Sequence, residues 1–210
     1  MLPAREPMSE KAVAEWVASA NASVDRFADV YRRTEQHRLA HGCALVPTSF
    51  GPFLGALSKA AGPLRILEVG TGLGYSALSL AWGARGGLVD TIEQDETHAV
   101  EASAMADEKG FGSRVTVYEG HSDQVLPTLR DGYDFAHFDG DARGSLAALA
   151  QFERLLRMDG LLVSAGLFPG VVLNEPPNLA EVAAYRTRLL DGEVWSTSFL
   201  PGGIALSLRL

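Results

Sequence analysis

The stretch "EVGTGLGYS", residues 68–76, places three glycines within five positions, directly after the apolar pair Ile66-Leu67. Glycine tolerates positive φ angles and lets a ligand approach the backbone closely. The following residues, "YSALSLAWGA" (75–84), have the pattern of a helix, so the loop joins a strand to a helix. In open α/β sheets, ligands bind at this edge, beyond the carboxyl ends of the strands. The alternative is a tight turn that needs glycine for its geometry alone.

Strands and helices alternate along most of the chain. Strands are expected at 62–69, 88–93, 114–119, 133–139 and 161–166, with helices at 96–109, 122–129 and 145–157. Apolar strands that alternate with helices predict a parallel sheet covered on both faces. The last segments, "EVWSTSFL" (193–200) and "IALSLRL" (204–210), alternate apolar and polar residues around "PGG" and predict an antiparallel hairpin.

The N-terminal part is expected to be helical. Residues 9–40 have the pattern of a helix that begins at the cap residue Ser9, and Pro52 opens a shorter helix that reaches about Lys59. Together these observations predict a single domain over residues 1–210, with a helical cover (1–60) and an α/β core (61–210).

Composition restricts the classes of function. The chain has 210 residues, a net charge of −8 and one cysteine, Cys43. The acidic balance argues against a nucleic-acid partner, and no apolar run reaches the roughly 18 residues that a membrane span requires. The N-terminus lacks the apolar region of a secretory signal. We therefore expect a cytoplasmic protein with no membrane partner.

Two acidic residues indicate which ligand the glycine loop holds. The spacing is G-x-G-x-G, whereas the dinucleotide fingerprint is G-x-G-x-x-G. Glu93, at the end of the second expected strand, can bind both ribose hydroxyls of a nicotinamide dinucleotide or of an adenosyl ligand. Glu68 would repel a pyrophosphate but suits an ammonium or sulfonium charge. The pair favours S-adenosylmethionine (SAM), with a nicotinamide-dependent oxidoreductase as the less favoured alternative.

Four segments resemble the class I SAM-dependent methyltransferases. They are "LEVGTGLGYSALSLA" (67–81), "TIEQDE" (91–96), "EGHSDQVLP" (119–127) and "YDFAHFDGDA" (133–142). The branch they resemble most is the O-methyltransferase family that contains the catechol and caffeoyl-CoA enzymes. The resemblance covers roughly residues 40–210. It implies a seven-stranded, Rossmann-like sheet with an antiparallel last strand, methyl transfer from SAM to an oxygen of a small molecule, and a homodimer.

The resemblance also implies a cofactor contact for each matched position. The positions are Glu68, Gly70, Gly72 and Asp139 for the methionine part of SAM; Tyr75, Ser76 and Thr48 for its carboxylate; Glu93, with Gln94 beside it, for the ribose; and Gly120, His121 and Ser122 for adenine.

The metal positions of that family are incomplete in this chain. Asp139 matches the first metal-binding aspartate, but the later Asp-Asn pair falls on Ala165 and Gly166, which offer no side-chain oxygen. Hard cations need several oxygen ligands. We therefore expect no metal in the active site and methyl transfer that is insensitive to chelation, unless Asp141 or Asn174 replaces the missing pair.

Catalytic candidates are Asp139 and Asp141, although Asp141 fits a helix cap equally well. His137 is interpreted as structural, facing a covering helix. Because this chain lacks residues that the family uses at its metal positions, there is an alternative function: a SAM-binding protein without transferase activity that serves as a sensor or partner subunit. The sequence does not name the methyl acceptor.

Overall fold

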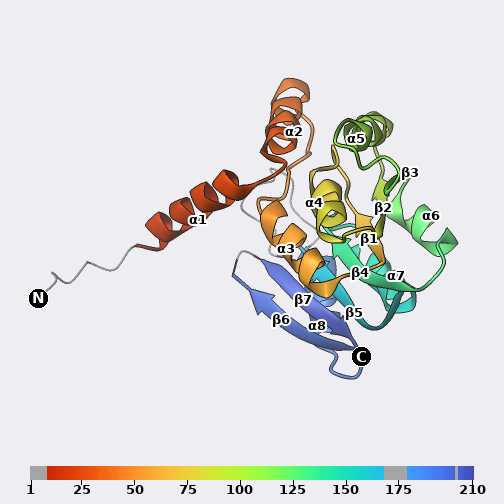
Figure 1. Cartoon of the computed structure of the whole chain (residues 1–210). Coiled ribbons are helices and arrows are strands. Elements are labelled where there is room, and N and C mark those ends of the chain that lie inside the picture. Colours follow the sequence, from red (N-terminus) through yellow and green to blue (C-terminus); the bar gives the residue numbers. More distant parts are fainter. Residues whose placement is uncertain (1–8, 168–178, 202) are drawn as a thin grey trace, which may run out of the picture.

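The computed structural model describes residues 9–167, 179–201 and 203–210. A seven-stranded sheet in the order β3-β2-β1-β4-β5-β7-β6 forms its centre (Figure 1). Strands β1 to β5 pair in parallel, whereas β7 is antiparallel to both of its neighbours. The bounds are β1 Arg65–Val69, β2 Leu88–Glu93, β3 Val115–Glu119, β4 Tyr133–Phe138, β5 Leu156–Ser164, β6 Trp195–Leu200 and β7 Ile204–Arg209. This topology confirms the predicted open sheet with a C-terminal hairpin.

Helices cover both faces of the sheet. Their bounds are α1 Glu10–Val24, α2 Ala28–His41, α3 Gly51–Ala61, α4 Tyr75–Gly83, α5 Glu96–Glu108, α6 Ser122–Val125, α7 Ser145–Leu155 and α8 Leu179–Leu189, with a 3₁₀ turn at Leu126–Thr128. Successive residues of a strand point to opposite faces. Thus Ile66 packs with side chains of α3, α4 and α5, while Leu67 packs with those of α7 and α8. None of the helices in the described ranges has the length and apolarity needed to cross a bilayer.

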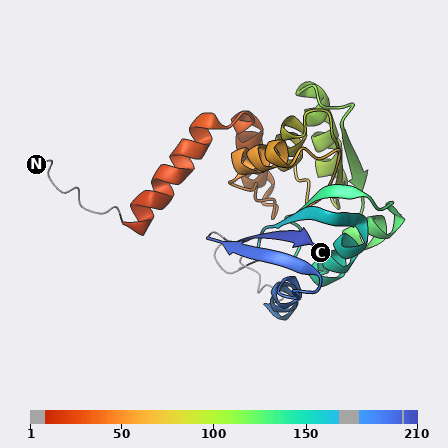
Figure 2. The same cartoon turned by 60° about the horizontal axis from the view of Figure 1, so that its bottom comes forward.

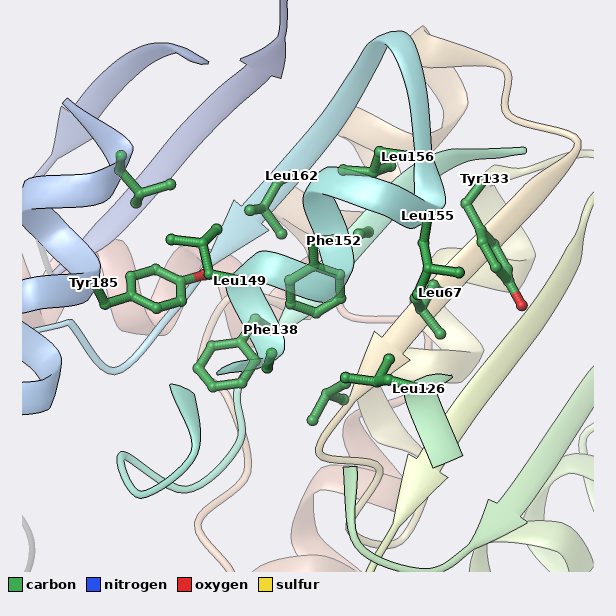
Figure 3. Packing of buried hydrophobic residues seen from close by; sticks show 14 of the residues in the cluster. Leu67, Leu126, Tyr133, Phe138, Leu149, Phe152, Leu155, Leu156, Leu162 and Tyr185 are labelled. Atoms are coloured by element: carbon green, nitrogen blue, oxygen red, sulfur yellow. The ribbon is translucent and has the colours of Figure 1, made fainter. Parts of the chain in front are cut away.

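Aromatic residues fix α7 and α8 against the ends of the central strands (Figure 3). The ring of Phe138 stacks on Tyr185 with a centroid distance of 5.5 Å and meets Phe152 edge-on at 6.0 Å. The hydroxyl of Tyr185 is fully buried, and it lies 2.7 Å from the hydroxyl of Ser164. Because a buried hydroxyl needs a partner, this hydrogen bond fixes α8 next to the end of β5.

Three sequence-based expectations were wrong in detail. The helix expected over 9–40 begins at the predicted cap, Ser9, but it is interrupted after Val24, where Asp25 accepts a hydrogen bond of 2.9 Å from the amide of Phe27. As a result, α1 projects away from the sheet in both views (Figures 1 and 2). Strand β5 begins at Leu156, earlier than expected, and contains a register shift against β4. Helix α8 was not predicted, although Val182, Tyr185 and Leu189 have helical spacing and are buried.

Candidate active site

The carboxyl ends of the central strands meet at one edge of the sheet. Backbone hydrogen bonds join these ends: the amide of Gly70 donates to Ile92, that of Asp139 to Val69, and that of Gly120 to Glu93, with distances of 2.8–3.1 Å. The residues that follow β1, β2, β3 and β4 are therefore neighbours. The structure brings the predicted glycine loop, Glu93, the 120–122 segment and Asp139 together here.

The backbone conformation favours glycine at all three positions of the loop. Gly70, Gly72 and Gly74 have φ angles of +97°, +54° and +92°. A Cβ on Gly70 would collide with the backbone carbonyl of Asp139, and Gly74 is the N-cap of α4. At Gly72 the obstacle is a side chain, since a Cβ would lie 2.6 Å from Cδ1 of Leu45 in the segment before α3. The turn thus favours glycine by its own geometry, and this geometry is compatible with a ligand at the same edge.

Glu93 connects the glycine loop to the end of β2. Its Oε2 accepts the amide of Gly72 at 2.8 Å, and its Oε1 accepts the amide of Asp95 at 3.0 Å. The side chain is buried, whereas the adjacent Gln94 is exposed. Each carboxylate oxygen has a second lone pair, so both oxygens can still accept a hydroxyl. The loop amide thus holds the carboxylate in a fixed orientation at the sheet edge.

Glu68 lies beneath the loop instead of facing out of it. Strand register places it opposite Thr91 on β2 and His137 on β4. Its Oε2 accepts the hydroxyl of Thr91 at 2.6 Å, and its Oε1 lies 3.0 Å from Nδ1 of His137. Both Glu68 and His137 are fully buried. Glu68 therefore supports the start of the loop, and it has no exposed oxygen.

His137 faces the helical cover, as its structural interpretation required. Its ring meets Phe50, the residue before α3, edge-on at 6.2 Å. Nε2 of His137 has no hydrogen-bond partner among the described residues. If Nδ1 carries the proton and donates to Glu68, Nε2 is an unpaired acceptor, which is tolerated better than an unpaired donor.

At the start of α4, the side chain and the amide of Tyr75 have different surroundings. The hydroxyl of Tyr75 donates to Oδ2 of Asp25 at 2.6 Å, so the side chain points into the N-terminal cover. Burial and the neighbouring Asp25 raise the pKa of Tyr75. However, no side chain caps α4, so the amides of its first turn, including those of Tyr75 and Ser76, are available to an anion. The predicted approach of Tyr75 and Ser76 to the SAM carboxylate would therefore involve their amides, and the side chain of Tyr75 points elsewhere.

Asp139 lies beside Ala165 and Gly166, the positions where the resemblance would place an Asp-Asn pair. A Cβ on Gly166 would lie 3.9 Å from Oδ1 of Asp139, while Ala165 is buried. Burial raises the pKa of Asp139; the neighbouring Glu68 adds to this effect and His137 opposes it. The structure therefore brings the three positions together with one carboxylate among them. Asn174 lies outside the described residues.

Other candidates are more peripheral. Asp141 is exposed, and its Oδ1 accepts the amide of Arg143 at 2.8 Å. Since Gly144 is the N-cap of α7, the helix-cap interpretation of Asp141 was wrong. His121 and Ser122 begin α6, directly after Gly120. The hydroxyl of Thr48 is buried and has no partner in the described part of the chain.

Comparisons with known proteins agree with this geometry. A family model described as "Methyltransferase domain" matches residues 67–164. A putative O-methyltransferase of Mycobacterium sp. (strain JLS) is 32% identical over 81% of this chain and 79% of that protein. The catechol O-methyltransferase of Mycobacterium tuberculosis is 35% identical over 68% and 66%, respectively.

A solved structure matches almost the whole chain. Cofactor-bound Rv0187 from MTB is 28% identical and has a TM-score of 0.75, with 97% of this chain and 99% of that chain covered. The matched residues 67–164 include the glycine loop, Glu93, the segment 120–122 and Asp139, which are the elements that meet at the sheet edge. The chain belongs to the class I SAM-dependent O-methyltransferases.

Proposed function

We propose that this protein transfers the methyl group of SAM to an oxygen atom of a small-molecule acceptor, without a divalent metal at the acceptor position. The observation that carries the proposal is the sheet edge where Glu93, held by the amide of Gly72, and Asp139, after β4, lie on either side of the end of β1. Family membership supplies the reaction class, and this geometry supports the assignment of the residues.

The residues at this edge fit SAM. Glu93 would accept the ribose hydroxyls through its remaining lone pairs, and the free amides at the start of α4 suit the methionine carboxylate. The carboxylate of Asp139 suits the methionine ammonium. The segment of Gly120, His121 and Ser122 borders the ribose position and would contact adenine.

Glu68 would contribute indirectly. Both of its oxygens are engaged by Thr91 and His137, so it would stabilise the loop that carries Gly70 and Gly72. We propose the same kind of indirect role for Tyr75, whose hydroxyl attaches α4 to Asp25.

The acceptor would be activated without a bound cation. Bound SAM would supply an electrophilic methyl carbon. The acceptor oxygen would form its bond to this carbon in line with the breaking C–S bond, and S-adenosylhomocysteine would leave. Positioning accounts for much of the rate of such a step. With Ala165 and Gly166 at the family's metal positions, the acceptor oxygen must either be acidic itself or donate its proton to a carboxylate. Asp139 is the proposed base, because its carboxylate lies beside Gly166 and its raised pKa favours proton acceptance. The exposed Asp141 is the second candidate.

A homodimer is part of the proposal. Helix α1 stands away from the sheet and exposes an apolar stripe of Val13, Trp16 and Val17, with Trp16 65% exposed. An apolar stripe on a projecting helix is typical of an interaction surface. A second copy of the chain, as the resemblance implies, would cover it. We also propose a cytoplasmic location, which the single cysteine favours.

The function is tested in two steps. Calorimetry should detect binding of SAM and of its product S-adenosylhomocysteine (SAH), but not of NAD. Labelled SAM is then incubated with catechols, monohydroxylated aromatics and acyl-CoA esters. Methylation of an acceptor oxygen supports the proposal. Binding of NAD in place of SAM would overturn it, and SAM binding without turnover of any acceptor would contradict the transferase assignment.

A further inference from the structure

Two histidines and the only cysteine of the chain lie close together beside the sheet edge that is proposed to bind SAM. His37 belongs to α2, His98 to α5, and Cys43 to the connection between α2 and α3. One potential ligand atom from each lies within 4.8 Å of the other two. His98 is buried, and His37 and Cys43 are half-buried. Neither the family positions nor the proposed reaction uses these three side chains.

The spacing of the two imidazoles matches a tetrahedral metal. Nε2 of His37 lies 3.2 Å from Nε2 of His98. Two nitrogens bound to one zinc ion at about 2.0–2.1 Å in tetrahedral geometry are separated by about 3.3 Å. A thiolate and an imidazole nitrogen on the same ion are about 3.6 Å apart. Cys43 lies on a connection without helix or strand, so a small displacement of its side chain would complete the set.

The other nitrogen of each ring faces a carboxylate. Nδ1 of His37 lies 3.5 Å from Oε1 of Glu101, and Nδ1 of His98 lies 3.9 Å from Oε1 of Glu93 and from Oδ1 of Asp95. Histidines that bind zinc through one nitrogen usually donate the other N–H to a carboxylate or carbonyl, which fixes the ring and raises its basicity. Here both rings direct Nε2 inward and Nδ1 toward an acid. The nearby carboxylates also compensate the charge of a cation.

We propose that His37, Cys43 and His98 bind one zinc ion, with water or another ligand in the fourth position. The ion would join α2 to α5 and fix the connection that begins at Cys43. That connection contains Leu45, whose side chain lies over Gly72, and ends near Thr48. The proposed role of the ion is structural: it would hold the connection from Cys43 to Leu45 in place over the glycine loop. It does not depend on the proposed reaction, and no acceptor chemistry is assigned to it.

Metal binding is tested on the full chain. The protein is stripped with a chelator, and zinc is added in competition with a chromophoric chelator of known affinity. Cobalt(II) serves as the spectroscopic probe, since a tetrahedral site with one thiolate gives intense d–d bands and a thiolate-to-cobalt charge-transfer band. We expect one equivalent of zinc and both cobalt features. If the two imidazoles only share a hydrogen bond, the protein will bind no stoichiometric zinc and cobalt will show neither band. That result would overturn the proposal.

Variants identify the ligands. Cys43→Ser should abolish the charge-transfer band. Loss of a carboxylate that hydrogen-bonds to a metal-binding histidine typically weakens metal affinity by roughly 10–100-fold. Because Cys43→Ser and His37→Gln each alter a ligand itself, each should weaken zinc binding by at least this factor. His41→Gln is the matched control, because His41 lies on the same helix with its ring 4.4 Å from that of His37 but outside the cluster. Circular dichroism of the metal-free variants checks folding. Unchanged zinc affinity in folded Cys43→Ser would refute the site.

Discussion

Replacing Glu93 by alanine tests the cofactor site directly. The carboxylate accepts the amides of Gly72 and Asp95 and is placed to accept ribose hydroxyls as well. Hydrogen bonds to a charged group contribute about 1.5–3 kcal/mol. We therefore expect SAH to bind about 10–150-fold more weakly to Glu93→Ala, since each 1.4 kcal/mol is a factor of ten. Isothermal titration calorimetry measures the change, and Glu96→Ala, an exposed acid three residues later, is the control.

The same substitution also releases the loop amides, so the two effects must be separated. A double-mutant-cycle design does this by titrating the wild type and Glu93→Ala with SAH and with its 2′,3′-dideoxy analogue. If Glu93 binds the ribose, the penalty of the substitution should be much smaller for the analogue. Equal penalties for both ligands would show that Glu93 acts only by shaping the loop at Gly72. An unchanged SAH affinity would remove Glu93 from the site altogether.

The remaining predictions concern charge, packing, assembly and metal. Asp139→Asn should weaken SAM binding and should stabilise the ligand-free chain at neutral pH. Desolvation raises the pKa of Asp139 above that of a free aspartate, so the folded chain holds this proton to a higher pH than the unfolded chain, and the side chain destabilises the fold increasingly as pH rises through this range. Urea denaturation at several pH values would show a free energy of unfolding that falls less with rising pH in the variant than in the wild type. Tyr75→Phe should cost about 1.5 kcal/mol of stability through the lost bond to Asp25, with SAH affinity unchanged; a large loss of affinity would contradict the indirect role. Trp16→Glu should convert a dimer into a species of 22.4 kDa in sedimentation, whereas a wild type that is already monomeric would refute the dimer. Added Mg²⁺ should leave the methylation rate unchanged, and activity that EDTA removes and Mg²⁺ alone restores would show that other ligands replace the missing pair.

The architecture could be predicted from the sequence because its signals are local. The glycine loop, the apolar strands and the alternating C-terminal hairpin each specify their element within a few residues, and the structure confirms them. The break after α1 was missed because Asp25 interrupts a helical pattern with a hydrogen bond to Phe27 that composition does not reveal. The sequence does contain a signal for helix α8, namely the helical spacing of the buried residues Val182, Tyr185 and Leu189.

The sequence indicates which candidate site residues meet at the sheet edge, but not the directions of their side chains. Glu93 and Asp139 lie where strand ends must meet in a parallel sheet. In contrast, Glu68 and Tyr75 match family positions and yet direct their polar atoms to His137 and Asp25. Such pairings join residues that are 50 and 69 positions apart in the chain. They depend on tertiary packing that no local pattern contains.

Glu93 connects the two proposed sites. One of its oxygens accepts the amide of Gly72, which lies under Leu45, and the other faces Nδ1 of His98. A zinc ion on Nε2 of His98 would favour the Nδ1–H form of the ring and attract this carboxylate, while the same ion would fix the connection from Cys43 to Leu45. Both effects act on the group proposed to hold the ribose, and neither reaches Asp139 directly. Loss of zinc would therefore weaken cofactor binding before it altered the methyl-transfer step, and zinc and SAM would each bind more tightly in the presence of the other.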